Sequence, residues 1–152
     1  MIKKKIILIL FIFLNHCGFS PVYNSEQKSE FNITISGIAG DNYINSLMTN
    51  KLKNKNNKLS ENQFNLTINN NYKKTVILKD TKGSPSEYEL SLETSVFIEK
   101  NEKNMKTVLF NEKQIIKNIS DPFKLKNYEN TIKENFVDST IRKLKFELIN
   151  FE

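Results

Sequence analysis

The stretch from Glu87 to Ile98 alternates apolar and polar residues more regularly than any other part of the chain. Side chains of a β-strand point alternately to its two faces, so a period of two predicts a strand with one buried face and one wet face. The apolar members are Tyr88, Leu90, Leu92, Val96 and Ile98, and the polar ones are Glu87, Glu89, Ser91, Glu93 and Ser95. The chain is therefore expected to build a sheet that is covered on one side only.

Shorter alternating runs predict three further strands. The first contains Phe31, Ile33 and Ile35 and ends at Gly37 and Gly40. The second begins with Phe64, Leu66 and Ile68 and resumes at residues 76–78 after an Asn-rich interruption, and the last covers residues 106–119. Turn-forming residues at 80–85 and 101–104 join the last three strands as two antiparallel hairpins.

Two segments have the spacing of apolar residues that is typical of a helix face. The first, residues 41–56, has Asp41 as its predicted N-cap, and the second is opened by Asp121 and Pro122 and runs to about residue 148. Their apolar positions are Tyr43, Ile44, Leu47, Met48 and Leu52 in the first, and Tyr128, Ile132, Phe136, Ile141, Leu144 and Leu148 in the second.

Basic residues crowd the C-terminal halves of both predicted helices. They are Lys51, Lys53, Lys55 and Lys58 in the first, and Arg142, Lys143 and Lys145 in the second. Solvated lysines suit the negative end of a helix dipole, and a cationic face for acidic lipid headgroups is the alternative interpretation.

The order of elements predicts an α+β fold. It reads β-α-β-β-β-α, in which the first two strands, joined through a helix, should be parallel. We expect a two-layer sandwich of a four-stranded mixed sheet with both helices on one face.

The N-terminal segment has the pattern of an export signal. Lys3, Lys4 and Lys5 precede an unbroken apolar run from Ile6 to Leu14. A membrane-spanning helix needs roughly 20 apolar residues, so this run favours a cleaved signal over a permanent anchor. The predicted organisation is a signal peptide at residues 1–16, a lipidated tether at 17–30 and a single domain at 31–152.

Cys17 is the only cysteine of the chain and directly follows this segment. A lone cysteine in an exported protein has no disulfide partner, and its position indicates lipidation of the thiol rather than a buried structural role. Leu14 matches the lipoprotein cleavage pattern, whereas Asn15 and His16 replace the small residues that usually follow. Gly18, in place of Asp, favours delivery to the outer membrane.

Composition excludes several classes of site. His16, the single histidine, is removed with the signal, so zinc sites built on Cys or His and Ser–His–Asp triads are not expected. Without the three signal lysines, 20 basic residues face 17 acidic ones, a net charge of +3 that does not indicate nucleic-acid binding. Glu87, Glu89 and Glu93 could be catalytic acids, but on a wet face without metal ligands they are better interpreted as solvent-facing charges.

The segment Cys17-Gly18-Phe19-Ser20-Pro21-Val22-Tyr23 resembles the start of LptE, the lipopolysaccharide-assembly lipoprotein family, whose mature forms open with Cys-Gly-Phe-x-Pro-hydrophobic-Tyr. The order of elements is also similar over the whole mature chain. The resemblance implies a non-enzymatic subunit without a cofactor other than the lipid on Cys17. It would be anchored in the outer membrane on the periplasmic side, plug the LptD β-barrel and contact lipopolysaccharide.

Two other hypotheses are compatible with the sequence. The chain could be an unrelated periplasmic lipoprotein that binds a ligand or supports another envelope complex. A hydrolase is the weaker alternative, because the mature chain would have no histidine and shows no convincing acid pair in an apolar setting.

Overall fold

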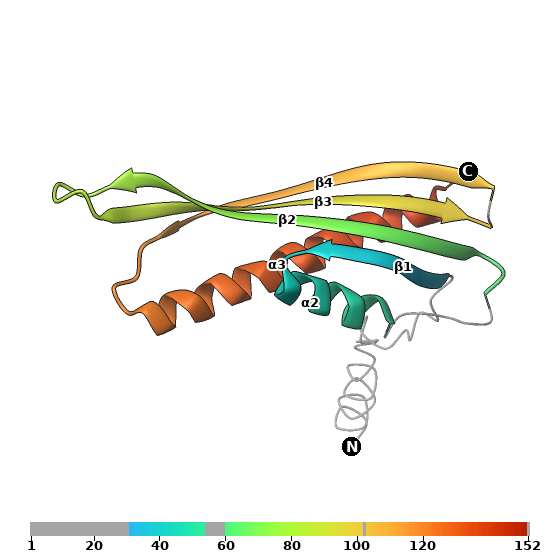
Figure 1. The fold of residues 1–152 in the computed structure, drawn as a ribbon, viewed down its shortest axis with the longest axis horizontal. Helices are drawn as coiled ribbons and strands as arrows, with labels where there is room; N and C mark the ends of the chain where they lie inside the picture. Colours follow the sequence, from blue (N-terminus) through green and yellow to red (C-terminus); the bar gives the residue numbers. More distant parts are fainter. Residues whose placement is uncertain (1–30, 54–59, 102, 152) are drawn as a thin grey trace, which may run out of the picture.

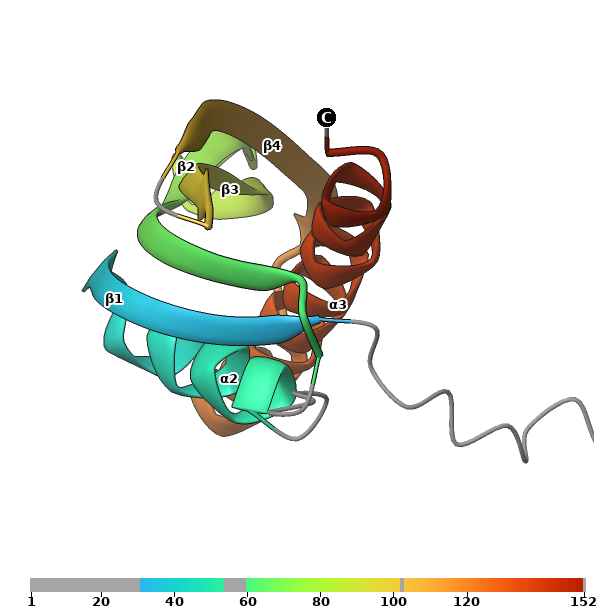
Figure 2. The same cartoon turned by 90° about the vertical axis from the view of Figure 1, so that its right-hand side faces the viewer.

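The computed structural model describes residues 31–53, 60–101 and 103–151. They form β1 (Asn32–Gly40), α2 (Asn42–Lys53), β2 (Gln63–Lys79), β3 (Pro85–Lys100), β4 (Asn104–Lys117) and α3 (Pro122–Ile149). The strands make one sheet in the order β1-β2-β3-β4, with β1 parallel to β2 and the other pairs antiparallel. Both helices lie on the same side of this sheet (Figures 1 and 2). The predicted α+β fold is confirmed.

The first strand and helix meet at a sharp change of direction. The backbone of Gly40 has φ of +105°, and a Cβ added there would lie 1.7 Å from the carbonyl oxygen of Asn70 on the neighbouring strand. Only glycine fits such a close approach without strain. Asp41 then caps α2, because its side chain accepts the N–H of Ile44 at 3.0 Å. The described helix ends at Lys53, and the remainder of the predicted helix lies outside the described residues.

The second strand differs from the expectation in one respect. The Asn-rich segment does not interrupt it, since Asn69, Asn70 and Asn71 continue the antiparallel pairing with β3. The side chain of Asn70 is buried and accepts a hydrogen bond from Thr94 at 2.8 Å. Asparagine has a low strand propensity, but pairing on both sides, with β1 and with β3, outweighs it here.

The last helix begins at Pro122, as predicted, with the side chain of Asp121 accepting the N–H groups of Phe123 and Lys124. Tyr128 was expected in the core and is exposed, while Glu129 and Lys133 are buried instead. In the part of the chain that the structure describes, no helix is long and apolar enough to cross a membrane.

The apolar core lies between the sheet and the two helices. On the sheet it includes Phe64, Leu66, Ile68, Leu90, Leu92, Val96 and Ile98, and on the helices Ile44, Met48, Leu52, Ile132, Phe136, Val137, Ile141, Leu144 and Leu148. Phe64 also makes edge-to-face contacts with Phe31 and Phe151, each at 5.6 Å between ring centroids. The residues of β3 predicted to be buried thus lie in the core, except Tyr88, which is half-buried and packs against it.

One end of the molecule extends past most of this core. We call it the distal arm, and it comprises residues 71–93, 111–117 and 122–133. In Figure 1 the hairpin of β2 and β3 extends past β1 and α2, with the end of β4 and the start of α3 beside it. On the strands of the distal arm the buried apolar residues are Leu90, Leu92 and Ile116. The distal arm therefore has much less apolar packing than the rest of the sheet.

Candidate functional site

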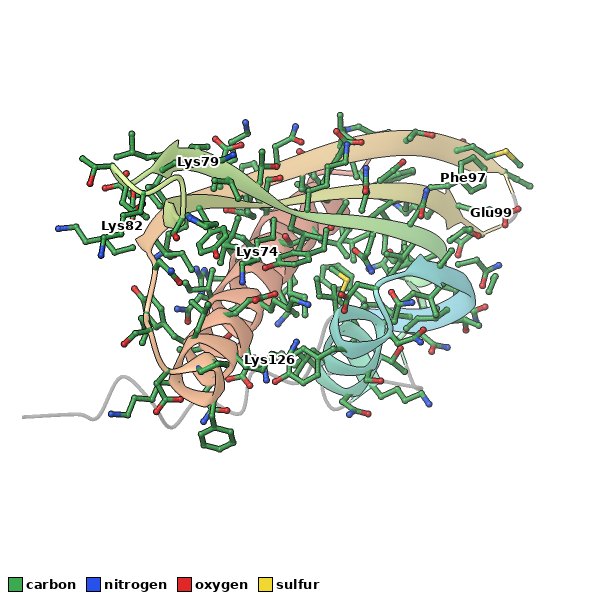
Figure 3. All side chains as sticks on the ribbon, turned by 60° about the vertical axis from the view of Figure 1, so that its left-hand side comes forward. Lys74, Lys79, Lys82, Phe97, Glu99 and Lys126 are labelled. Atoms are coloured by element: carbon green, nitrogen blue, oxygen red, sulfur yellow. The ribbon has the colours of Figure 1, made fainter. Side chains whose placement is uncertain are left out.

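The tip of the distal arm combines positive charge with exposed apolar side chains. Residues 73–86 contain four lysines and one aspartate, a local net charge of +3. Figure 3 shows Lys79 and Lys82 at the free end of the hairpin, and Phe97 and Glu99 at the opposite end of the sheet. Such a surface is suited to a ligand that carries both anionic and apolar groups.

The apolar part of the tip arises from a break in strand register. The pairing of β2 with β3 shifts between Val76 and Leu78, so Ile77 has no opposite residue. Alternation fails at this bulge, and all three side chains are exposed, by 40% for Val76, 44% for Ile77 and 53% for Leu78.

The turn that carries Lys82 is held by Asp80. Its carboxylate accepts the backbone N–H groups of Lys82 and Ser84, both at 2.8 Å. Gly83 follows with φ of +83° and open space around its Cα. An Asx-type turn of this kind fixes the backbone of the tip while its lysine side chains stay in solvent.

Below the tip lies a set of ionisable side chains that we call the buried charge cluster: Asp41, Tyr72, Lys74, Glu129 and Lys133. Lys133 Nζ is 2.9 Å from Asp41 Oδ2 and 3.9 Å from Glu129 Oε1. Glu129 also accepts hydrogen bonds from the Tyr72 hydroxyl at 2.9 Å and from Lys74 at 3.0 Å. The cluster thereby joins the start of α2, the distal part of β2 and the first turns of α3.

Aromatic rings complete the surroundings of the two lysines. Lys133 Nζ lies 4.0 Å from the ring centroid of Tyr72, and Lys74 Nζ lies 4.5 Å from that of Tyr88. The side chain of Lys133 is only 5% exposed and that of Glu129 only 10%. Charges this deeply buried are tolerated because each has an opposite charge and hydrogen-bond partners.

The two carboxylates of the cluster are held ionised. Burial raises the pKa of Asp41, but the hydrogen bond from Ile44 N–H and the contact with Lys133 outweigh it and bring the pKa below its usual value. Burial likewise opposes ionisation of Glu129, and the hydrogen bonds from Lys74 and Tyr72 lower its pKa overall. Burial and the neighbouring Glu129 raise the pKa of Tyr72 well above 10, so its hydroxyl remains a donor.

The lowered pKa values of Asp41 and Glu129 predict a loss of stability in acid. A carboxylate with a lowered pKa in the folded state stabilises the fold above its unfolded pKa, about 4, and that stabilisation is lost as the pH falls through the folded value. We expect the urea midpoint of the wild type to fall more steeply between pH 5 and pH 3 than that of the Asp41→Asn, Glu129→Gln double variant. Parallel curves for the two proteins would contradict this assignment.

The remaining predicted site residues have simpler surroundings. Of the three glutamates considered as catalytic acids, Glu89 pairs with Lys113 at 3.3 Å on the uncovered face of the sheet. Lys51 pairs with Asp138 and Lys143 with Glu112, both at 2.6 Å. These two lysines therefore join elements of the fold, which argues against the interpretation that they form a cationic face for acidic lipid headgroups. Among the described residues no group of His, Cys, Asp and Glu could hold a metal ion.

Cys17, the tether and the motif Gly18 to Tyr23 lie outside the described residues. Lys55 and Lys58 do so as well. Lipidation of Cys17 therefore stays a prediction from the sequence.

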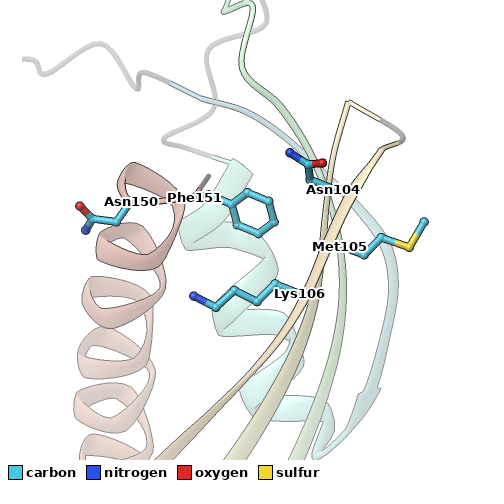
Figure 4. Close-up of a pocket in the computed structure, with 5 residues that line it drawn as sticks. All are labelled: Asn104, Met105, Lys106, Asn150 and Phe151. Atoms are coloured by element: carbon cyan, nitrogen blue, oxygen red, sulfur yellow. The ribbon is translucent and has the colours of Figure 1, made fainter.

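Two shallow hollows follow the seam between β4 and the end of α3. One, of about 300 Å³, is lined by Asn104, Met105, Lys106, Asn150 and Phe151 (Figure 4). The other, of about 480 Å³, is lined by Leu109, Phe110, Arg142, Lys143, Phe146 and Glu147. The Lys106–Glu147 ion pair of 2.7 Å joins the two walls. Both hollows are shallow, and Lys106, Lys143 and Glu147 in their walls are already held in ion pairs, so the distal arm is the better candidate site.

The buried charge cluster escaped sequence reasoning. Glu129 and Lys133 are four residues apart and share the inner stripe of α3 with Ile132 and Phe136. The sequence feature that could have revealed the cluster is this pair of opposite charges at core positions of an otherwise apolar stripe. The spacing of the apolar residues alone does not reveal it.

The fold is similar to that of known bacterial lipoproteins. Rare lipoprotein B from Shewanella oneidensis superposes with a TM-score of 0.58 at 12% identity, over 78% of this chain and 98% of that one. A minor lipoprotein from Acinetobacter baumannii gives 0.54 at 9% identity, over 80% and 90% of the two chains. A putative lipoprotein from Caulobacter crescentus gives 0.52 at 10% identity, over 81% and 90%.

These likenesses concern the fold. Each solved lipoprotein is covered almost over its whole length, so the arrangement of four strands and two helices is shared as a unit. No protein-family model and no curated protein matches the sequence.

Proposed function

We propose that this chain is a lipid-anchored subunit of the outer membrane that acts as LptE does, as plug and assembly partner of an LptD β-barrel in lipopolysaccharide transport. The observation that carries the proposal is that two independent features occur in the same chain. The LptE-like opening, Cys17 to Tyr23, precedes a domain whose fold is similar to that of rare lipoprotein B. Under this proposal the subunit is not an enzyme and needs no cofactor beyond its covalent lipid.

The part of the uncovered face that β2 and β3 form supports a place inside a barrel, whereas β4 presents the exposed apolar side chains of Met105, Leu109 and Ile115. A barrel lumen is polar, so a plug needs a hydrophilic outer surface rather than the apolar one of an ordinary obligate interface. The outward-facing positions of β2 and β3 are largely Asn, Thr, Ser and Glu, namely Asn65, Thr67, Asn69, Asn71, Glu89, Ser91, Glu93 and Ser95.

The tip of the distal arm is the proposed contact for lipopolysaccharide. Lipid phosphates would pair with Lys79 and Lys82, and acyl groups would contact the apolar bulge around Ile77. The two lysines and the apolar bulge lie at the same end of the β2–β3 hairpin.

Depletion of the chain in its native host tests the function. We expect less lipopolysaccharide at the cell surface and less correctly assembled LptD, because the barrel would lack its partner. Normal surface lipopolysaccharide after depletion would instead favour a lipoprotein of another envelope complex.

The anchoring step gives a separate prediction. Wild-type protein grown with a labelled fatty acid should carry the label, whereas a Cys17→Ser variant should carry none, since only the thiol forms the thioether. Equal labelling of the two proteins would rule out Cys17 as the lipidation site.

A charge reversal tests the lipid contact. We expect the Lys79→Glu, Lys82→Glu variant to bind purified lipopolysaccharide about tenfold more weakly, the equivalent of about 1.4 kcal/mol. The matched control is Lys53→Glu, Lys103→Glu, which changes the net charge equally at exposed positions outside the distal arm. Equal weakening by the two variants would show that only net charge matters.

A further inference from the structure

The apolar core and the buried charge cluster hold different parts of the molecule. Nearly all of the large buried side chains of β2 lie before Asn70, whereas the rest of this strand has Tyr72 half-buried and residues 73–79 exposed. Beyond the same point α3 contributes Glu129 and Lys133 to the interior. The distal arm is thus fixed by the buried charge cluster together with only a few buried apolar side chains, those of Leu90, Leu92, Ile116 and Ile132, and the remainder mainly by apolar packing.

A buried polar pair marks the boundary between the two parts. Asn70 and Thr94 are paired opposite each other on β2 and β3, are almost fully buried and share a hydrogen bond of 2.8 Å. Phe110 lies opposite Thr94 on β4. This polar pair interrupts the row of apolar side chains on the inner faces of β2 and β3 at one point.

Each contact of the buried charge cluster either joins the two parts of the molecule or lies within the distal arm. Asp41, at the start of α2, belongs to the core side, whereas Lys74, Glu129 and Lys133 belong to the distal arm. Lys133 is the link between the two sides, at 2.9 Å from Asp41. Cooperative units of a fold that are held by few apolar contacts open at a lower free energy than the core.

We propose that the buried charge cluster is a latch, and that the distal arm opens and closes as a unit while the rest of the molecule, with most of the apolar core, remains folded. Opening separates Lys133 from Asp41. Lys74, Lys79 and Lys82 move with the distal arm, so the tip that bears these lysines changes its position relative to the core. The inference rests on the packing alone and does not depend on the proposed function.

Native-state hydrogen exchange of the full chain, measured by mass spectrometry, tests this device. In the wild type we expect amides of residues 71–79 and 85–91 to be at least about 100-fold less protected than those of residues 64–68 and 95–98, since they exchange through the smaller opening. Equal protection of the two sets would overturn the proposal.

Two variants separate the latch from the core. Leu144→Ala removes a fully buried side chain of the core and should lower protection of core amides about 100-fold. Protection of the distal arm should change less than threefold, because the core contacts persist when the arm is open. Glu129→Gln weakens the latch and should lower protection of both sets.

A molecule that opens only as a whole gives a different result. Leu144→Ala would then lower protection of the distal arm and of the core by the same factor, and that outcome would overturn the proposal. If Leu144→Ala does not fold, the milder Ile141→Val variant, with an expected loss of about fivefold in the core, gives the same comparison.

Discussion

Replacement of Lys133 by methionine is expected to lower the free energy of unfolding by about 3 kcal/mol, because it leaves the partly buried Asp41 without its ion-pair partner. Methionine keeps most of the aliphatic volume, so the loss reports the charge rather than a cavity. Glu129 keeps its hydrogen bonds from Lys74 and Tyr72. The expected loss of free energy of unfolding is therefore at the lower end of the range for a broken buried ion pair. Urea unfolding at pH 7 measures it.

The control is Lys106→Met. Lys106 pairs with Glu147 at 2.7 Å, but its side chain is half-exposed, and such surface pairs contribute less than about 1 kcal/mol. Equal losses for the two variants would show that the buried charge cluster has no special role in stability.

The Gly40→Ala variant should lose about 3 to 4 kcal/mol, from backbone strain at positive φ together with overpacking against the adjacent strand. The new Cβ would meet the carbonyl oxygen of Asn70 at 1.7 Å, and neither backbone can move without breaking the pairing of β1 with β2. Thermal or urea unfolding of the purified domain checks this loss.

Gly37 supplies the matched control on the same strand. A Cβ added there would make an ordinary contact of 3.5 Å with Thr67 Cγ2, so Gly37→Ala should change stability by less than about 1 kcal/mol. If Gly40→Ala is as stable as Gly37→Ala, the close approach of β1 to Asn70 is not a constraint on the fold.

The order and type of the elements could be predicted from the sequence because each has a strong period. The alternation from Leu90 to Ile98 and the spacing from Ile132 to Leu148 identify their buried faces almost residue by residue. A sheet with one covered face then follows from the wet positions of β3. Local patterns suffice here because burial on one side imposes them along the whole element.

The features that escaped prediction depend on partners far away in the chain. Asn70 was assigned to an interruption of the strand, although it is buried through its pairing with Thr94. Tyr128 was assigned to the core, and Glu129 took the inner position because Lys74 and Tyr72 of β2 satisfy its charge. Such tertiary partners override local polarity and leave no periodic signal.

The candidate site was predictable only in part. The lysine-rich composition of residues 73–82 is visible in the sequence, but no particular lysine could be chosen there. The bulge at Ile77 and the turn fixed by Asp80 are what place Lys79 and Lys82 beside exposed apolar side chains. Register shifts of this kind depend on the pairing of two strands and are not encoded in either one alone.

Co-purification is the most direct test of the proposed partnership between this chain and an LptD barrel. An affinity-tagged chain extracted from outer membranes in gentle detergent should elute in a one-to-one complex with LptD, identified by mass spectrometry. The complex should also form with the Lys79→Glu, Lys82→Glu variant, since the proposed lipid contact is separate from the barrel contact. Elution of the chain as a free monomer without a β-barrel partner would contradict the account.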